Sequence, residues 1–187
     1  MSAFFGPVIQ QGYVVPDVEV AMQHWLARGV GPFVFVDIND FPGIYDDQPI
    51  LAKMQAGFAY SGDQQIEVIT PSPDHPSIYQ DYLTESPCGG LQHLAYWVNS
   101  VDEKLAELSN QHIRHKVWQR YGEPPDYQAH AYLDLIDYPG IMIQLMARSD
   151  FYDLLFGLLQ EAAQSWDGKT APIRLLDAAN ARLVTRE

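Results

Sequence analysis

The chain has 187 residues, of which 47% are apolar and 12% aromatic, enough to build a packed core. The formal net charge is −13, which disfavours a nucleic acid or an anionic membrane surface as a partner, because both require a cationic face. The single cysteine, Cys88, rules out an intramolecular disulfide and a cysteine-based zinc site.

The N-terminal residues 1–7 lack the basic region and following apolar stretch of a signal peptide. No apolar run approaches the roughly 20 residues that a helix needs to cross a bilayer. We therefore expect a cytoplasmic protein with no membrane partner.

The first half of the chain predicts the element order β-α-β-β-β. Residues 8–15 are apolar and β-rich, as in a strand. Asp17 is placed to cap a helix whose apolar residues, from Val18 to Leu26, recur at helical spacing. Three further strands are predicted, over residues 32–38, 51–60 and 64–69.

The second half predicts the same order after a connection over residues 72–89 with one helical turn near residues 78–83. A strand is predicted over 91–98, and Ser100 with Glu103 forms a capping box for the next helix. The remaining strands are predicted over 113–118, 129–135 and 141–146, with a turn at 137–140 before the last one.

The two halves are an internal repeat. Tyr13 aligns with Tyr96, and the helix cap Asp17 with the helix cap Ser100. We therefore predict an α+β fold in which two βαβββ modules, about residues 8–71 and 90–147, form a curved mixed sheet around a half-barrel trough. These modules would make one domain over residues 1–150.

A C-terminal helical extension is predicted over residues 151–187. Its helix carries one apolar stripe that would pack on the domain or on a partner subunit, formed by Phe151, Leu154, Leu155, Leu158, Leu159 and Ala162.

Four polar residues stand at repeat-related positions on apolar strands: Gln10, Glu67, His93 and Gln144. A buried polar group without a partner costs about 1–3 kcal/mol, so the four are expected to converge on one partner. A divalent cation would satisfy all of them.

Four motifs, in order, resemble those of the glyoxalase/bleomycin-resistance/dioxygenase (vicinal-oxygen-chelate) superfamily, on its glyoxalase-like branch near methylmalonyl-CoA epimerase. They span about residues 8–147 and read Gln10-x-Gly-Tyr-Val-Val-Pro-Asp17, Gln65-Ile-Glu-Val-Ile-Thr-Pro71, Gly90-Leu-Gln-His-Leu-Ala-Tyr96 and Pro139-Gly-Ile-Met-Ile-Gln-Leu145.

The resemblance implies a divalent metal, such as zinc, nickel, manganese or iron, held by Gln10, Glu67, His93 and Gln144. Glutamine stands at 144 where the family usually has glutamate, and an amide cannot accept a proton near neutral pH. This departs from classical glyoxalase I. The set also lacks the two histidines and carboxylate of an iron dioxygenase. A homodimer is implied as well.

Further site residues are predicted on the neighbouring strands. By resemblance, His130 stands on a cavity-lining strand and could act as a base; the alternative is an ordinary half-exposed histidine. Glu67 could also be the base. Tyr132 could orient a substrate carbonyl, and Val14 with Trp97 could form the apolar wall of the pocket. Packing in the core is the alternative for these last three.

Two functions follow. The first is a metal-dependent lyase or isomerase that abstracts a proton next to the metal-bound oxygen of a small carbonyl, oxo-acid or thioester substrate. The second is a metal-free protein that binds and sequesters a small molecule, which the two glutamines favour.

Overall fold

The computed structural model describes residues 4–137 and 140–186. The turn predicted at 137–140 lies partly outside these residues, as does the start of the N-terminal segment. The first module contains β1 (Gln10–Val14), α1 (Val18–Leu26), β2 (Phe33–Tyr45), β3 (Gln48–Ser61) and β4 (Gln64–Pro71). After α2 (Ile78–Glu85), the second contains β5 (Gly90–Val98), α3 (Val101–Asn110), β6 (His115–Tyr121), β7 (His130–Leu135) and β8 (Met142–Ala147).

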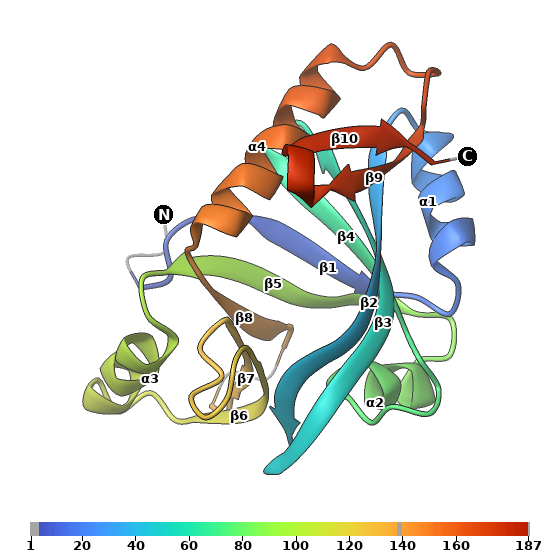
Figure 1. Cartoon of the computed structure of the whole chain (residues 1–187). Helices are drawn as coiled ribbons and strands as arrows, with labels where there is room; N and C mark the ends of the chain where they lie inside the picture. Colours follow the sequence, from blue (N-terminus) through green and yellow to red (C-terminus); the bar gives the residue numbers. More distant parts are fainter. Residues whose placement is uncertain (1–3, 138–139, 187) are drawn as a thin grey trace.

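The strands build the predicted pair of βαβββ modules. Neighbouring strands in the sheet run β2-β3-β4-β1 and then β5-β8-β7-β6, so β1 and β5 meet at the centre (Figure 1). An additional pairing joins the far end of β2 to β6, at Gly43 with Tyr121. The expected trough is therefore closed into a barrel along part of its length.

The register at the centre preserves the repeat. In the antiparallel β1–β5 pair, Gln10 lies opposite Ala95 and Gly12 lies opposite His93. These pairs exchange under a local twofold axis, because Gln10 is equivalent to His93 and Gly12 to Ala95. The same axis relates the parallel pairs β1–β4 and β5–β8.

The predicted helix starts are confirmed by their caps. The Asp17 side chain accepts a hydrogen bond from the Val20 backbone N at 3.0 Å, and Ser100 accepts one from the Glu103 N at 3.3 Å. Each cap satisfies an amide that the helix itself leaves open. The caps also set where the chain turns back from the central strand of each module.

The sequence predicted a helical extension over residues 151–187, but only its first part is helical. Helix α4 spans Asp150–Ser165, but β9 (Ile173–Asp177) and β10 (Arg182–Thr185) follow it, separated by one short 3-10 turn. β9 pairs in parallel with β2, covering an edge that would otherwise expose unpaired backbone groups. Figure 1 shows α4 and this hairpin together at one end of the barrel.

The apolar stripe of α4 packs on the chain's own sheet. Leu155 and Leu159 form a buried cluster with Val34 of β2, while Phe151 and Leu154 stay exposed. This stripe was the sequence feature supporting a homodimer. Because part of it is buried within the chain, that support is weaker, and the dimer stays a prediction. Among the described helices, none is long and apolar enough to cross a membrane.

Candidate active site

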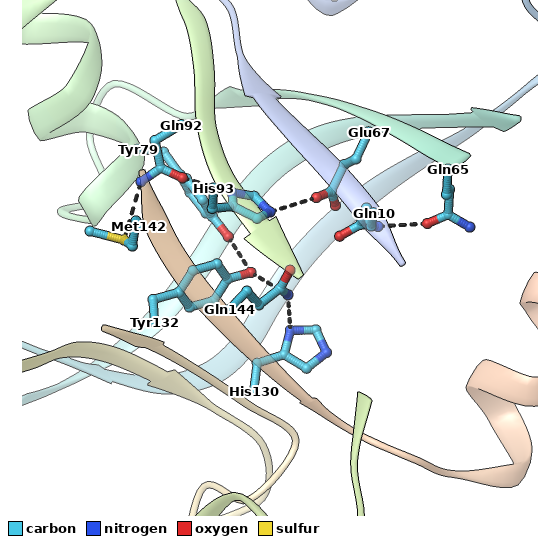
Figure 2. Close-up of polar contacts among 10 residues, drawn as sticks. All are labelled: Gln10, Gln65, Glu67, Tyr79, Gln92, His93, His130, Tyr132, Met142 and Gln144. Carbon is cyan, nitrogen blue, oxygen red and sulfur yellow. Dashed lines mark hydrogen bonds and ion pairs between the residues drawn. The ribbon is translucent and has the colours of Figure 1, made fainter. Parts of the chain in front are cut away.

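The barrel interior brings together the four polar residues predicted as ligands. Gln10 comes from β1, Glu67 from β4, His93 from β5 and Gln144 from β8. Their exposed fractions are 1%, 8%, 0% and 1%, far too low for ordinary surface polar residues. Figure 2 shows their polar ends directed toward one region between the central strands.

Gly12 makes room for this cluster. It pairs with Glu67 across one edge of β1 and with His93 across the other. A Cβ atom placed on Gly12 would lie 2.0 Å from His93 Cε1, which no real contact permits. The glycine of the Gln10-x-Gly motif is therefore required for the imidazole of His93 to occupy its place.

His93 is held from both sides of its ring. Its Nδ1 lies 2.7 Å from Gln92 Oε1, and its Nε2 lies 3.2 Å from Glu67 Oε2. Because Gln92 Oε1 can only accept, Nδ1 carries a proton. In the neutral imidazole, Nε2 then offers a lone pair toward a carboxylate oxygen, an arrangement that requires a proton or a cation as a third partner.

The two glutamines both direct a free oxygen into the interior. Gln10 Nε2 donates to Gln65 Oε1 at 2.6 Å, and Gln144 Nε2 donates to the Tyr132 hydroxyl at 2.8 Å. Their Oε1 atoms are buried and have no hydrogen-bond partner among the described residues. Buried amide oxygens left in this state favour a bound cation or a ligand donor.

The donor set therefore fits a divalent ion. Two amide oxygens, one carboxylate and one imidazole are all accepted ligands of such ions. Within the described part of the chain, no cluster of three or more histidine, cysteine, aspartate or glutamate side chains could hold a metal. Any ion here depends on the amide oxygens of Gln10 and Gln144.

A chain of hydroxyl and imidazole groups leads away from Gln144. Tyr79 of α2 donates to the Tyr132 hydroxyl at 2.8 Å. Gln144 Nε2 also lies 3.2 Å from His130 Nδ1, and His130 Nε2 lies 2.6 Å from the Tyr152 hydroxyl of α4. Burial raises the pKa of Tyr132 well above its usual value, helped by the charge of Glu67.

His130 lies beside Gln144 and lines the cavity, but its surroundings make it a poor base. Burial, and then the nearby His93, lower the pKa of His130 to about 3. The ring is neutral near pH 7, and a base whose conjugate acid is so strong takes up a proton weakly. Between the two predicted bases, these surroundings favour Glu67.

A cavity of about 570 Å³ opens beside this centre. Gln10, Glu67, His130 and Tyr132 all line it. Its size is within the usual range of small-molecule sites.

Two predicted wall residues do not line the cavity. Val14 is fully buried in the core beyond it. Trp97 instead packs under α4, with its ring centroid 4.9 Å from that of Phe156. Spacing along a strand carries no information on how far along the barrel the cavity extends.

Sequence reasoning missed Tyr79 and Tyr152. Both come from helices, and strand alternation carries no signal for them. Gln65 and Gln92, which position Gln10 and His93, lie within two residues of the predicted ligands Glu67 and His93 and could have been found as supports.

Two paired βαβββ modules, with buried polar residues at equivalent strand positions, define the class of fold to which this barrel belongs. Residues 9–129 match the model of the glyoxalase/bleomycin resistance protein/dioxygenase superfamily. The chain belongs to this superfamily, as its motifs indicated. The match ends before Gln144 and before α4.

Solved structures share the fold. The chain resembles a methylmalonyl-CoA epimerase from Mycobacterium tuberculosis, with 20% identity, a TM-score of 0.50, and coverage of 82% of this chain and 95% of that one. A hypothetical protein from Bacillus halodurans C-125 gives 15% identity, a TM-score of 0.53, and coverage of 77% and 95%. Among curated protein sequences, none matches this chain. Likeness at these identities concerns the fold alone.

Proposed function

We propose that this protein is a metal-dependent isomerase or lyase that moves a proton at a carbon next to a carbonyl group. One observation carries the proposal: Gln10 and Gln144 hold their amide nitrogens in hydrogen bonds and leave two buried carbonyl oxygens open. Such oxygens, next to Glu67 and His93, form a place for a cation.

Gln10, Glu67, His93 and Gln144 would hold the ion. When bound, a divalent ion supplies Lewis acidity that stabilises negative charge developing on a substrate oxygen. Gln92 fixes the His93 ring through Nδ1, and Gln65 fixes the Gln10 amide. These supports keep the ligands in one orientation.

Glu67 would take the proton. It lines the cavity, so a substrate there can reach its carboxylate. The C–H bond breaks, its proton goes to Glu67, and the electron pair moves onto the substrate's carbonyl oxygen. Return of the proton to carbon would complete an isomerase cycle. In a lyase cycle the enolate would expel a leaving group with its bonding electron pair, and Glu67 would pass its proton to that group or to water.

Tyr132 would orient the substrate. Its hydroxyl accepts hydrogen bonds from Tyr79 and Gln144, and its raised pKa keeps its own proton in place as a donor. Gln144 takes no part in proton transfer, because an amide has no suitable basic site.

Elemental analysis tests the metal. We expect close to one divalent ion per chain, either as purified or after dialysis with zinc, nickel, manganese or iron. The variants Glu67→Gln and His93→Ala should reduce metal affinity by about 10-fold or more. His24→Ala is the matched control, since His24 is exposed on α1.

Proton transfer is tested separately, by NMR detection of deuterium incorporated from D₂O into a panel of ketones and thioesters. Incorporation that Glu67→Gln abolishes supports the proposal. If both single variants, Glu67→Gln and His93→Ala, keep their full metal content, the ligand assignment is refuted.

A second candidate function is metal-free binding and sequestration of a small molecule. The contact between His93 and Glu67 favours it, because the two groups can share a proton and so pair without an ion. Absence of metal under all the conditions above, together with saturable ligand binding, would select it.

The proposal also includes the domain division, the cellular location and the oligomeric state predicted from the sequence. Residues 1–150 would form the superfamily domain, and residues 151–187 an extension that packs on it and lines its cavity. The protein would be a cytoplasmic homodimer that acts on a small molecule. Sedimentation equilibrium of the full chain measures the oligomeric state directly.

A further inference from the structure

The cavity beside the polar centre is built from three parts of the chain. Residues 36–41 of β2 line one side, β7 carries His130 and Tyr132 on another, and α4 with Leu176 of β9 closes over it. The C-terminal extension, which lies outside the superfamily match, thus forms part of the wall. Its residues contribute to the choice of substrate.

Most of this wall is aromatic or aliphatic. Besides the site tyrosines, the rings that line it are Phe41, Phe58, Tyr121, Phe151 and Phe156. Phe41 stacks on Tyr121 with ring centroids 5.1 Å apart, so these rings are held in place. Rings arranged around a cavity favour flat apolar ligands through offset and edge contacts.

The charges at the cavity have one sign. Asp37, Asp40 and Glu123 line it and are exposed, which places them at its open side, and Glu67 lies inside. No lysine or arginine is found among the described residues that line it.

An acidic rim with no basic side chain beside it disfavours anionic ligands. The whole chain carries a net charge of −13, which adds to the repulsion. The phosphates of a CoA thioester, or a carboxylate that lies at the rim, would meet like charge there with no basic side chain to pair with. Of the predicted substrate classes, uncharged carbonyl compounds are therefore favoured over oxo-acids and CoA thioesters.

From this geometry we infer that the substrate is an uncharged, largely apolar carbonyl compound with an aromatic or similarly flat ring system, held beneath α4. The inference rests on the proposed function for the carbonyl group. The ring system and the lack of anionic charge rest on the cavity alone.

The test uses two probes of nearly the same shape. 2-Acetylnaphthalene is an uncharged aromatic ketone, and 2-naphthoate replaces its acetyl group with a carboxylate; acetyl-CoA is the third probe. Binding to the full chain is measured by isothermal titration calorimetry, as purified and after chelator treatment. We expect the ketone to bind at least about 10-fold more tightly than either anion.

Variants locate the site and the repulsion. Ala129→Phe narrows the cavity and should weaken ketone binding about 10-fold or more, whereas Ala106→Phe, on the exposed face of α3, should not. Asp40→Asn with Glu123→Gln should tighten 2-naphthoate binding and leave the ketone unchanged. Asp47→Asn is the matched control, because Asp40 and Asp47 are both exposed with φ of 57° and 60°.

Each outcome decides the inference. Anions that bind as tightly as the ketone overturn it, and so does failure of both naphthalenes to bind. Ketone binding by a protein that takes up no metal keeps this inference and rejects the proposed isomerase. Metal uptake and proton exchange by a protein that does not bind 2-acetylnaphthalene keep the proposed isomerase and reject this inference.

Discussion

At the residue scale, the polar centre depends on one missing side chain. Gly12 gives its space to the His93 ring, Gln65 orients the Gln10 amide, and Tyr132 with His130 orients the Gln144 amide. Each of these contacts involves one atom pair, so single substitutions test them.

Gly12→Ala should displace the imidazole of His93. We expect a loss of about 1–3 kcal/mol in the free energy of unfolding from overpacking, together with loss of metal binding. Urea unfolding and elemental analysis measure the two effects.

Gly157→Ala is the matched control for Gly12→Ala. A Cβ there meets nothing within 4 Å, and the helix should gain about 1 kcal/mol. A stable Gly12→Ala protein with normal metal content would contradict the role given to Gly12.

The buried tyrosines make the fold sensitive to alkali. Burial, with a contribution from Glu67, raises the pKa of Tyr152 to about 12, and the pKa of Tyr132 is raised as well. An unfolded tyrosine ionises near pH 10, so this stability is complete below pH 10 and is lost as the pH rises toward 12.

Absorbance of tyrosinate and circular dichroism should therefore change together above pH 10. Tyr152→Phe should move the transition to higher pH. Ionisation well before unfolding of the tyrosine whose absorbance Tyr152→Phe removes would show that this hydroxyl is not buried as described.

At the element scale, α4 acts as part of the core rather than as an appendage. Leu159 is 2% exposed and packs with Val34, whereas Leu154 is 40% exposed on the same helix. The extension therefore both stabilises the barrel and closes the cavity.

Leu159→Ala should cost about 2–5 kcal/mol in the free energy of unfolding, because it leaves a cavity against the sheet. Leu154→Ala, on the exposed face, should change it by less than about 0.5 kcal/mol. Thermal and urea unfolding measure both, and equal effects would place α4 away from the sheet.

At the scale of the whole molecule, the net charge of −13 opposes compaction. Ions screen such repulsion over about 10 Å at 0.1 M salt. The melting temperature should therefore rise between 10 mM and 200 mM sodium chloride. A melting temperature that stays constant or falls would mean that attractive pairs, such as Arg120 with Asp102, dominate instead.

Local patterns in the sequence sufficed for the modules and for the ligand candidates. Strand alternation put Gln10 and His93 on inward faces, and the caps at Asp17 and Ser100 marked equivalent helix starts. Period and capping act over a few residues, so the sequence by itself determined the paired βαβββ fold and the set of four polar residues.

Only the tertiary structure decided what surrounds that set. The β2–β6 closure, the cover provided by α4 and the contact between Tyr152 and His130 all join distant segments. Burial by those segments lowers the pKa of His130 and leaves Val14 outside the cavity. Such effects depend on what packs across space, which periodicity along the chain does not encode.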